Sequence, residues 1–283
     1  MYGCEIWGPT IISKNLKSLK SMNNIPLEIV QNNFCKHVLG VRRSASNVAA
    51  KAELGKFPIL QDIIGHATAY WQRFSKMSDQ RLAKLVYQNE IKEDEHVKNW
   101  SNKMKEISHH LGQNLSAIPT KTEMKNAFAN HYRELFLKEI ERENSILRTY
   151  KLFKTNYEQE PYTRVSIPKY DMQNLAKFRI GAHDLEIQRG RYQKPKSLPP
   201  AERICKLCSE GVEDEIHFLL QCPKHNNHRY LLEQDHTQTT EIQFIHLMQS
   251  NNLHVIMNIA KYITICNKER KNILSQPPPS QLK

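Results

Sequence analysis

The sequence predicts a mainly α-helical protein, and three observations lead to this prediction. Apolar residues recur at three- and four-residue steps through most of the chain, which is the helical period. Prolines and glycines stand at the ends of several of these segments, where helices begin and end. With 283 residues, 39% of them apolar and 25% charged, the chain can form one large domain or two ordinary ones. We expect a helical bundle, then a small CCHC zinc-knuckle-like module, then C-terminal helices.

Residues 1–155 contain the predicted bundle. Pro26 opens its first recognisable helix and Gly40 closes it. The apolar residues of this helix are Leu27, Val30, Phe34 and Val38. Ser46 can cap a short helix that ends at Gly55.

Pro58 opens a longer helix with one apolar face. That face consists of Leu60, Ile63, Ile64, Ala67, Trp71 and Phe74. An amphipathic segment follows, with Leu82, Leu85 and Val86 together on one side. Trp100, Met104, Ile107 and Leu111 then recur at helical spacing until Gly112.

The strongest helical pattern begins at Thr120, which forms a capping box with Glu123. Its apolar stripe consists of Met124, Phe128, Tyr132, Leu135, Phe136 and Ile140. Leu147, Tyr150 and Phe153 continue the spacing and predict that the helix extends through them. A core face explains this stripe more simply than a partner-binding face.

Four segments complete the predicted organisation. Residues 156–203 are a basic linker with a short helix that ends at Gly181, and residues 204–230 form the CCHC module. Residues 231–274 contain two further helices. Residues 275–283 include three consecutive prolines and are predicted to be a disordered tail.

The distribution of charge favours an anionic partner. The formal net charge is +12, and residues 1–78 and 164–206 each carry ten Lys/Arg against four Asp/Glu. Residues 79–160 are nearly neutral, with fourteen against thirteen. Two positive blocks favour RNA or DNA as the partner. A solvated basic surface without a partner is the alternative.

Cysteine usage and hydropathy indicate an intracellular protein of the nucleus or cytoplasm, with no membrane contact. Cys4, Cys35 and Cys266 lie among apolar neighbours and are interpreted as reduced core thiols. The N-terminus has no signal-peptide pattern, and the apolar run at residues 253–265 is interrupted by polar residues. A reducing compartment favours metal binding by the other three cysteines over disulfides.

The metal-site candidate is a C-x2-C-x8-H-x4-C array. Its members are Cys205, Cys208, His217 and Cys222. Three thiolates and one imidazole match the tetrahedral ligand set of a structural Zn²⁺, which leaves no position for a reactive water. Gly211 is free to take positive φ in the return of the loop, and His225 and His228 are weaker alternative ligands. The competing interpretation is free thiols near a core histidine.

Charged residues surround this array. The acidic group Glu210, Glu213, Asp214 and Glu215 is interpreted as a solvated face, with tuning of the zinc centre as the alternative. The basic residues predicted to contact nucleic-acid phosphates are Arg179, Arg189, Arg191, Lys194, Lys196, Arg203 and Lys206. Phe178 and Tyr192 are candidates for stacking on unpaired bases, although Phe178 also fits a core position.

No catalytic motif accompanies the array. The sequence contains no Walker loop, no Gly-x-Gly-x-x-Gly loop and no Gly-x-Ser-x-Gly elbow. His109 and His110 are adjacent but have no cysteine or carboxylate at ligand spacing. We therefore expect a protein without enzymatic activity.

Several short motifs resemble the C-terminal segment of non-LTR (LINE-type) retrotransposon reverse transcriptase polyproteins. In the C-terminal half they are Phe-Arg-Ile-Gly at 178–181, His-Asp-Leu-Glu-Ile at 183–187, Gly-Arg-Tyr at 190–192, Glu-Arg-Ile-Cys at 202–205 and Glu-Asp-Glu-Ile-His-Phe-Leu-Leu-Gln-Cys-Pro at 213–223. In the N-terminal half they are Tyr-Gly-Cys-Glu-Ile-Trp-Gly at 2–8, Phe-Cys-Lys-His-Val-Leu-Gly-Val at 34–41 and Glu-Leu-Gly-Lys-Phe-Pro-Ile at 53–59.

The resemblance implies a thumb-like helical region followed by a zinc element that holds RNA or target DNA. Cys205, Cys208, His217 and Cys222 match the zinc ligands of that family one for one. The family's Tyr-x-Asp-Asp catalytic turn has no counterpart, since no Asp-Asp pair occurs in the chain. The expected partners are RNA or DNA and the remainder of a retrotransposon ribonucleoprotein. The alternatives are a zinc-stapled protein–protein interaction module and a functionless transposon remnant.

Overall fold

The computed structural model is mainly helical, which confirms this part of the prediction. It describes residues 2–94, 96–114, 116–143, 145–232 and 238–276. Within these ranges no strand forms, and the nearest approach to one is an isolated antiparallel bridge between Ile204 and Val212. Among the helices described, none has the combined length and apolar character needed to cross a bilayer.

The chain divides into two compact units. The first consists of Met1–Asn32 and Lys56–Glu139, and the second of Asn33–Gly55 and Ile140–Lys283. This division differs from the predicted boundary at residue 155, because residues 33–55 belong with the C-terminal half of the chain. The order of segments along the chain does not reveal that residues 33–55 pack with a later part of the sequence.

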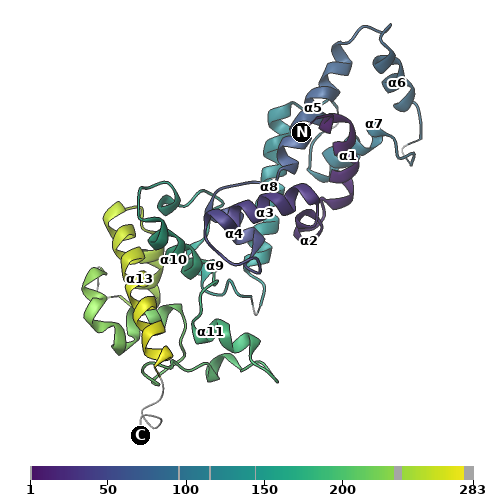
Figure 1. Cartoon of the computed structure of the whole chain (residues 1–283). Coiled ribbons are helices and arrows are strands. Elements are labelled where there is room, and N and C mark those ends of the chain that lie inside the picture. The colour runs from purple at the N-terminus through teal and green to yellow at the C-terminus, as the bar shows by residue number, and fades with distance from the viewer. Residues whose placement is uncertain (1, 95, 115, 144, 233–237, 277–283) are drawn as a thin grey trace. The chain divides into compact units, whose positions relative to one another are not determined.

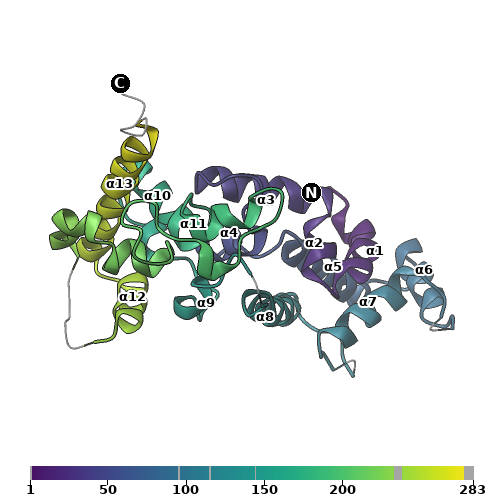
Figure 2. The same cartoon turned by 90° about the horizontal axis from the view of Figure 1, so that it is seen from below.

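The first unit is organised around helix α1 (Cys4–Asn15), which packs on α5 (Leu60–Lys76) and α7 (Trp100–His110) (Figures 1 and 2). Its other helices are α2 (Leu19–Asn23) and α6 (Leu82–Glu90), while α3 (Pro26–Val38) and α8 (Lys121–Ile140) contribute residues to both units. A Cβ at Gly8 would lie 2.4 Å from Ile63 Cγ2, so the close approach of α1 to α5 requires glycine. Helix α1 was not predicted from the sequence.

Helix ends follow the sequence signals closely. Thr120 and Glu123 form the predicted capping box, with Thr120 N–H donating to Glu123 Oε2 at 2.6 Å and Glu123 N–H donating to Thr120 Oγ1 at 3.2 Å. Ser46 Oγ accepts from the Ala49 N–H at 3.3 Å. The left-handed glycines that end helices as predicted are Gly40, Gly55, Gly112 and Gly181.

The predicted extension of α8 is wrong. The helix ends at Ile140, and α9 (Tyr150–Phe153) is a separate short helix. Leu147, Tyr150 and Phe153 are nevertheless buried. Apolar spacing therefore located the core residues correctly, although it did not reveal the break in the backbone.

Helix α3 begins and ends near the predicted residues but turns a different face inward. Val30 and Phe34 are 69% and 61% exposed, whereas Glu28 is fully buried. Glu28 Oε1 accepts a hydrogen bond from the N–H of Leu60, the first residue of α5, at 3.1 Å. A carboxylate at a helix N-terminus is stabilised by the unpaired N–H groups there, which compensates for its burial.

The predicted apolar face of α6 is also exposed. Leu82, Leu85 and Val86 are 77%, 45% and 49% exposed, and none of the nine residues of α6 is buried. Amphipathic spacing identified the helix but not its burial.

The second unit has α13 (Leu253–Ser275) packed along α10 (Lys169–Arg179) (Figure 1). Its other helices are α4 (Asn47–Glu53), α9, α11 (Glu186–Arg189) and α12 (Thr240–Gln249). Short 3₁₀ segments are η1 (Pro161–Thr163), η2 (Gly190–Tyr192), η3 (Pro200–Glu202) and η5 (Pro223–Leu231), and η4 (His217–Gln221) is a π-helical turn.

The predicted linker at 156–203 is therefore partly core. Leu175, Ala176 and Phe178 of α10 are buried, so this helix is a structural element of the unit. Helices α12 and α13 confirm the two predicted C-terminal helices. Of the predicted tail at 275–283, residues 277–283 lie outside the described residues.

Candidate metal centre

The first half of the centre is a tight loop that carries Cys205 and Cys208. Its ends are joined where the Cys205 N–H donates to Gly211 O at 2.7 Å. Within it, the Ser209 N–H donates to Cys205 O at 2.9 Å. Ser209 has φ 60° and is the left-handed residue of the loop, and Gly211 does not take positive φ.

The second half is the π-helical turn η4, which carries His217 and leads to Cys222. The His217 N–H donates to Asp214 Oδ1 at 2.8 Å, so the Asp214 side chain provides an acceptor for an N–H group at the start of the turn. The Cys222 N–H donates to His217 O at 2.7 Å, a hydrogen bond across five residues. This wider turn places residues 217 and 222 beside each other, and π turns of this kind are frequent at functional sites.

The four predicted ligands come together as one group. Their ligand atoms all lie within 4.8 Å of one another. Cys205 Sγ is 4.0 Å from Cys222 Sγ, and Cys208 Sγ is 3.3 Å from His217 Nε2. Two thiolates on a tetrahedral zinc ion, each bonded at about 2.3 Å, are separated by about 3.8 Å. The group can therefore hold a metal ion with little movement of its side chains.

Neither alternative histidine belongs to this group. His225 is buried against Phe218, with ring centroids 4.8 Å apart, and burial lowers the pKa of His225 to about 4. His228 Nε2 lies 2.7 Å from Glu269 Oε1 of α13. The structure thus agrees with the preference for Cys222 over both.

Hydrogen bonding and burial shift the pKa values of the three thiols. The hydrogen bond with Cys222 and then burial raise the pKa of Cys205 to about 12, while the same hydrogen bond lowers the pKa of Cys222. Burial also raises the pKa of Cys208. Since metal ions bind thiolates, metal binding at this group would release protons.

A buried ion pair supports the first cysteine. Arg270 of α13 donates from Nε to Glu213 Oε1 at 2.6 Å and from Nη2 to Glu213 Oε2 at 2.7 Å. Glu213 Oε1 in turn lies 3.8 Å from Cys205 Sγ. Glu213 also accepts from the Glu186 N–H at 2.8 Å. The centre is therefore connected to α11 and α13 rather than standing as a separate module.

A second buried carboxylate lies on the histidine side of the centre. Glu215 Oε1 is 2.9 Å from His183 Nε2, and Glu215 Oε2 accepts from Arg148 Nη2 at 2.6 Å. Burial by itself would raise the pKa of Glu215, but the hydrogen bond and charge of His183, with Arg148, hold this pKa below its usual value. Glu213 and Glu215 are each 1% exposed, so the prediction of a solvated acidic face is wrong for both.

Two of the seven predicted phosphate contacts are structural instead. Arg179 is 4% exposed and donates from Nε to Glu53 Oε2 at 2.8 Å and from Nη2 to Glu160 Oε2 at 2.5 Å. Arg203 is 6% exposed and donates to the carbonyl oxygens of Ile187 and Leu198. The prediction that these two guanidinium groups contact phosphates is wrong, because internal acceptors hold them inside the unit.

The other five predicted basic residues reach the surface to different degrees. Arg189 and Lys206 are 53% and 52% exposed and lie 3.8 and 3.0 Å from Glu186 Oε1. Arg191 is half-buried and donates to Ser145 O at 2.8 Å. Lys194 and Lys196 are exposed on the loop after η2.

The two stacking candidates separate clearly. Phe178 is 1% exposed and packs against Phe218, with ring centroids 5.6 Å apart, so it is a core residue. Tyr192 is 69% exposed and lies two residues before Lys194. Of these two candidates, Tyr192 is the one with an exposed aromatic ring.

Sequence analysis missed the residues that support the metal centre. Arg270, His183 and Arg148 all contact its acidic segment, yet Arg270 lies 57 residues from Glu213. No spacing rule connects residues so far apart. The sequence holds no local signal for them, because the burial of the two glutamates, which requires compensating charges, is apparent only in the folded unit.

Comparison of the chain with protein-family models, with curated proteins and with solved structures finds no match. The geometry of the centre therefore stands as the evidence about function.

Proposed function

We propose that this protein binds one structural zinc ion and uses the surface beside it to bind nucleic acid, without a catalytic centre of its own. The observation that carries this proposal is the convergence of three sulfur atoms and one imidazole within 4.8 Å. Zinc is the metal that such a donor set favours. Because all four positions are supplied by the protein, the ion would have structural rather than hydrolytic chemistry.

Zinc would hold together a part of the unit that has little regular structure. The ligands lie on a loop and a π-helical turn, and most of the surrounding segments are short 3₁₀ pieces. Binding of zinc by four ligands supplies folding free energy that such short segments lack by themselves. The ion would also keep the exposed basic loop at 193–199 in one position relative to α11.

Charge supports nucleic acid as the partner. The chain has a formal net charge of +12, and Lys194, Lys196 and Tyr192 are exposed within one short segment. Lysines contact phosphates, and an exposed tyrosine can stack on an unpaired base. In line with the resemblance to non-LTR retrotransposon reverse transcriptases, the proposed role is to hold RNA or target DNA for a polymerase active site located elsewhere.

Charge reversal on this loop tests the proposal. The zinc-loaded full chain is titrated against labelled single-stranded RNA and DNA at several salt concentrations, with fluorescence anisotropy as the readout. We expect micromolar, salt-dependent binding, roughly that of non-specific binders, and a strong loss of affinity in Lys194→Glu/Lys196→Glu. The matched control is Lys92→Glu/Lys98→Glu, which reverses two exposed lysines of the first unit. Absence of binding by the unaltered protein at low salt would refute the proposal.

The second candidate function is a zinc-stapled protein–protein interaction module. The observation that favours it is the exposed apolar side of α6, formed by Leu82, Leu85 and Val86. Exposed apolar groups on one helix are typical of partner-binding surfaces. The same charge reversal separates the two functions, because loss of loop lysines would leave binding through α6 intact.

A further inference from the structure

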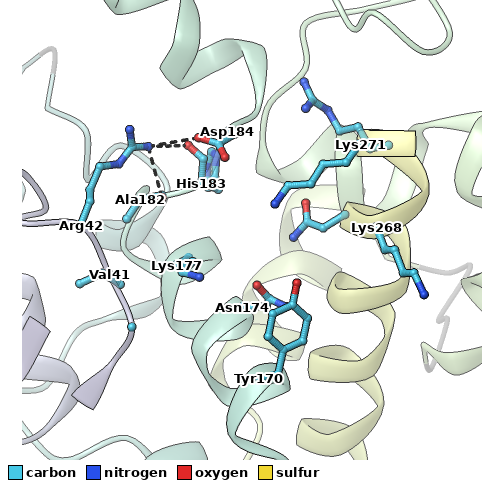
Figure 3. A pocket seen from close by; sticks show the side chains of 13 residues that line it. Val41, Arg42, Tyr170, Asn174, Lys177, Ala182, His183, Asp184, Lys268 and Lys271 are labelled. Carbon is cyan, nitrogen blue, oxygen red and sulfur yellow. Dashed lines mark hydrogen bonds and ion pairs between the residues drawn. The ribbon is translucent and has the colours of Figure 1, made fainter. Parts of the chain in front are cut away.

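A basic pocket lies within the second unit, and its lining includes none of the residues predicted to bind nucleic acid. It has a volume of about 440 Å³. One wall comes from α10 and the opposite wall from α13, as Figure 3 shows. Residues 40–42 and the loop 182–184 complete the lining. All of these segments belong to the same compact unit.

The charge that lines this pocket is strongly positive. Lys177 comes from α10, Lys268 and Lys271 come from α13, and Arg42 comes from the segment after α3. Among the described residues that line it, Asp184 carries the single negative charge, and Arg42 Nη2 lies 3.6 Å from its Oδ1. The charge of Arg270, which also lines the pocket, is compensated by Glu213.

The three lysines are available to a ligand. Within the described part of the chain, no ion pair or side-chain hydrogen bond of Lys177, Lys268 or Lys271 is formed. In Figure 3 the amino group of Lys271 points from α13 into the space that α10 faces, and Lys177 lies on the opposite side of that space. Like charges that face one another repel, and an anion placed between them relieves this repulsion.

The walls of the pocket are held by internal hydrogen bonds. Arg42 Nη2 donates to His183 O at 3.0 Å and to Ala182 O at 3.3 Å. Asn174 Nδ2 of α10 donates to Thr264 Oγ1 of α13 at 3.1 Å. A Cβ at Gly40 would lie 2.3 Å from the Gln173 side chain, so the backbone before Arg42 is pressed against α10. The backbone segments that carry the basic residues are therefore held in place by contacts within the protein.

An aromatic side chain stands beside the cations. Tyr170 belongs to the first turn of α10, lines the pocket and is 59% exposed. Figure 3 shows its ring on the α10 wall next to Asn174, on the same helix as Lys177. Lysines that contact phosphates, together with an exposed ring on which a base can stack, are the combination that single-stranded nucleic-acid sites use.

We propose that this pocket binds a phosphate group of a single-stranded nucleic acid, with Lys177 and Lys271 on the phosphate and Tyr170 stacked on an adjacent base. The choice of nucleic acid as the source of the phosphate rests on the proposed function. The pocket adds a second contact region to the loop at 193–199. Its ligand is recognised by charge and stacking rather than by hydrogen bonds to base edges.

The test uses the zinc-loaded full chain and a labelled single-stranded oligonucleotide of mixed sequence. For Lys177→Gln/Lys271→Gln we expect an affinity about tenfold weaker and a smaller salt dependence. The matched control is Lys169→Gln/Lys261→Gln, which removes one exposed lysine from each of the same two helices outside the pocket. This control should bind like the unaltered protein, and zinc content and circular dichroism should be the same in all variants.

Tyr170 is tested by a pair of substitutions. Tyr170→Leu should weaken single-strand binding by about fivefold or more, because stacking on that ring is lost. Tyr170→Phe keeps the ring and should retain the affinity. An equal loss in both variants would overturn the stacking contact.

Separate outcomes distinguish the pocket from the proposed function. If the unaltered protein binds the oligonucleotide and the Lys177/Lys271 variant binds it equally well, the pocket proposal is overturned and the proposed function stands. Pyrophosphate, followed by calorimetry, is the second probe. If the protein binds pyrophosphate through these lysines but binds no oligonucleotide, the proposed function and the nucleic-acid source are both overturned, and a small phosphate compound takes their place.

Discussion

Arg179 and Glu53 form a buried ion pair that joins α10 to α4, with Arg179 Nε 2.8 Å from Glu53 Oε2. The two residues lie 126 positions apart in the chain and are 4% and 0% exposed. Tyr162 also donates to Glu53 Oε2, at 2.6 Å, and Glu160 accepts from Arg179. Arg179 is therefore an interior residue. From the basic residues that surround it in the sequence, it had been predicted to contact phosphate.

Substitution of Arg179 by methionine should destabilise the protein severely. Glu53 would be left buried without its main countercharge, and breaking a buried pair in this way costs about 3–5 kcal/mol. The measurement is urea denaturation followed by circular dichroism. Lys169→Met on the same helix is exposed and should change the free energy of unfolding by less than about 0.5 kcal/mol. Normal stability in Arg179→Met, combined with weaker nucleic-acid binding, would instead restore the phosphate-contact role.

Loss of one metal ligand should remove the metal. Metal analysis of the purified protein is expected to find one zinc ion per chain, and Cys208→Ser should abolish it, because a hydroxyl is a far poorer zinc ligand than a thiolate. Chelation of the metal should lower the thermal midpoint of the second unit. Cys266→Ala is the control, since Cys266 is buried in α13 outside the ligand group. A metal-free protein whose folding does not change in Cys208→Ser would contradict the assignment.

Truncation of Phe34 in α3 and of Leu39 just after this helix should have very different effects on stability. Phe34 is 61% exposed, so Phe34→Ala should change the free energy of unfolding by less than about 0.5 kcal/mol. Leu39, directly after the helix, is fully buried, and Leu39→Ala should cost about 2–5 kcal/mol. Chemical denaturation of both variants measures the difference. A large decrease in the free energy of unfolding of Phe34→Ala would mean that the apolar stripe predicted from the sequence is the buried face.

Acidification should destabilise the first unit through His110. His110 is exposed, but partial desolvation of its ring, and then the charges of His131 and Lys17, lower the pKa of His110 below its ordinary value of 6.5. As the pH falls through that value, the unfolded chain takes up a proton that the folded unit resists, so the free energy of unfolding decreases. The effect is measured by denaturation between about pH 7.5 and about pH 5.5.

His110→Gln removes the titrating group from this position and should make the acid sensitivity smaller. His109→Gln, at the adjacent position of α7, is the matched control for the loss of an imidazole. An unchanged pH dependence in His110→Gln would show that other groups account for it.

Local signals predicted a large part of the fold. Pro26, Ser46 and the Thr120–Glu123 box marked helix starts correctly, and glycines at 40, 55, 112 and 181 marked ends. These signals act within one turn of the backbone, through a missing N–H, a capping side chain or a left-handed φ. The ligand set of the metal centre could also be predicted from the sequence, because the four residues lie close together in the chain at spacings typical of metal sites.

The sequence did not predict which charged and apolar side chains are buried. Val30 and Phe34 share a helical face that periodicity would bury, yet Glu28 and Lys36 occupy the inward side of α3. Glu28 is accepted there because it meets the N-terminus of α5, and Lys36 because its Nζ donates to Arg43 O at 2.6 Å. Such compensation depends on partners that another segment brings, so the pattern of one helix cannot predict it.

The amino-acid sequence alone therefore established a helical chain, the positions of most helix ends and the four residues able to hold a metal. Folding in three dimensions determined which cations remain available to a ligand. Arg179 and Arg203 donate their hydrogen bonds to acceptors inside the protein. Lys177 and Lys271, which the sequence did not identify as a pair, line a common pocket. The physical reason is that a charge enters the interior only where distant segments supply its hydrogen-bond and ionic partners, and those partners are assembled by the tertiary structure.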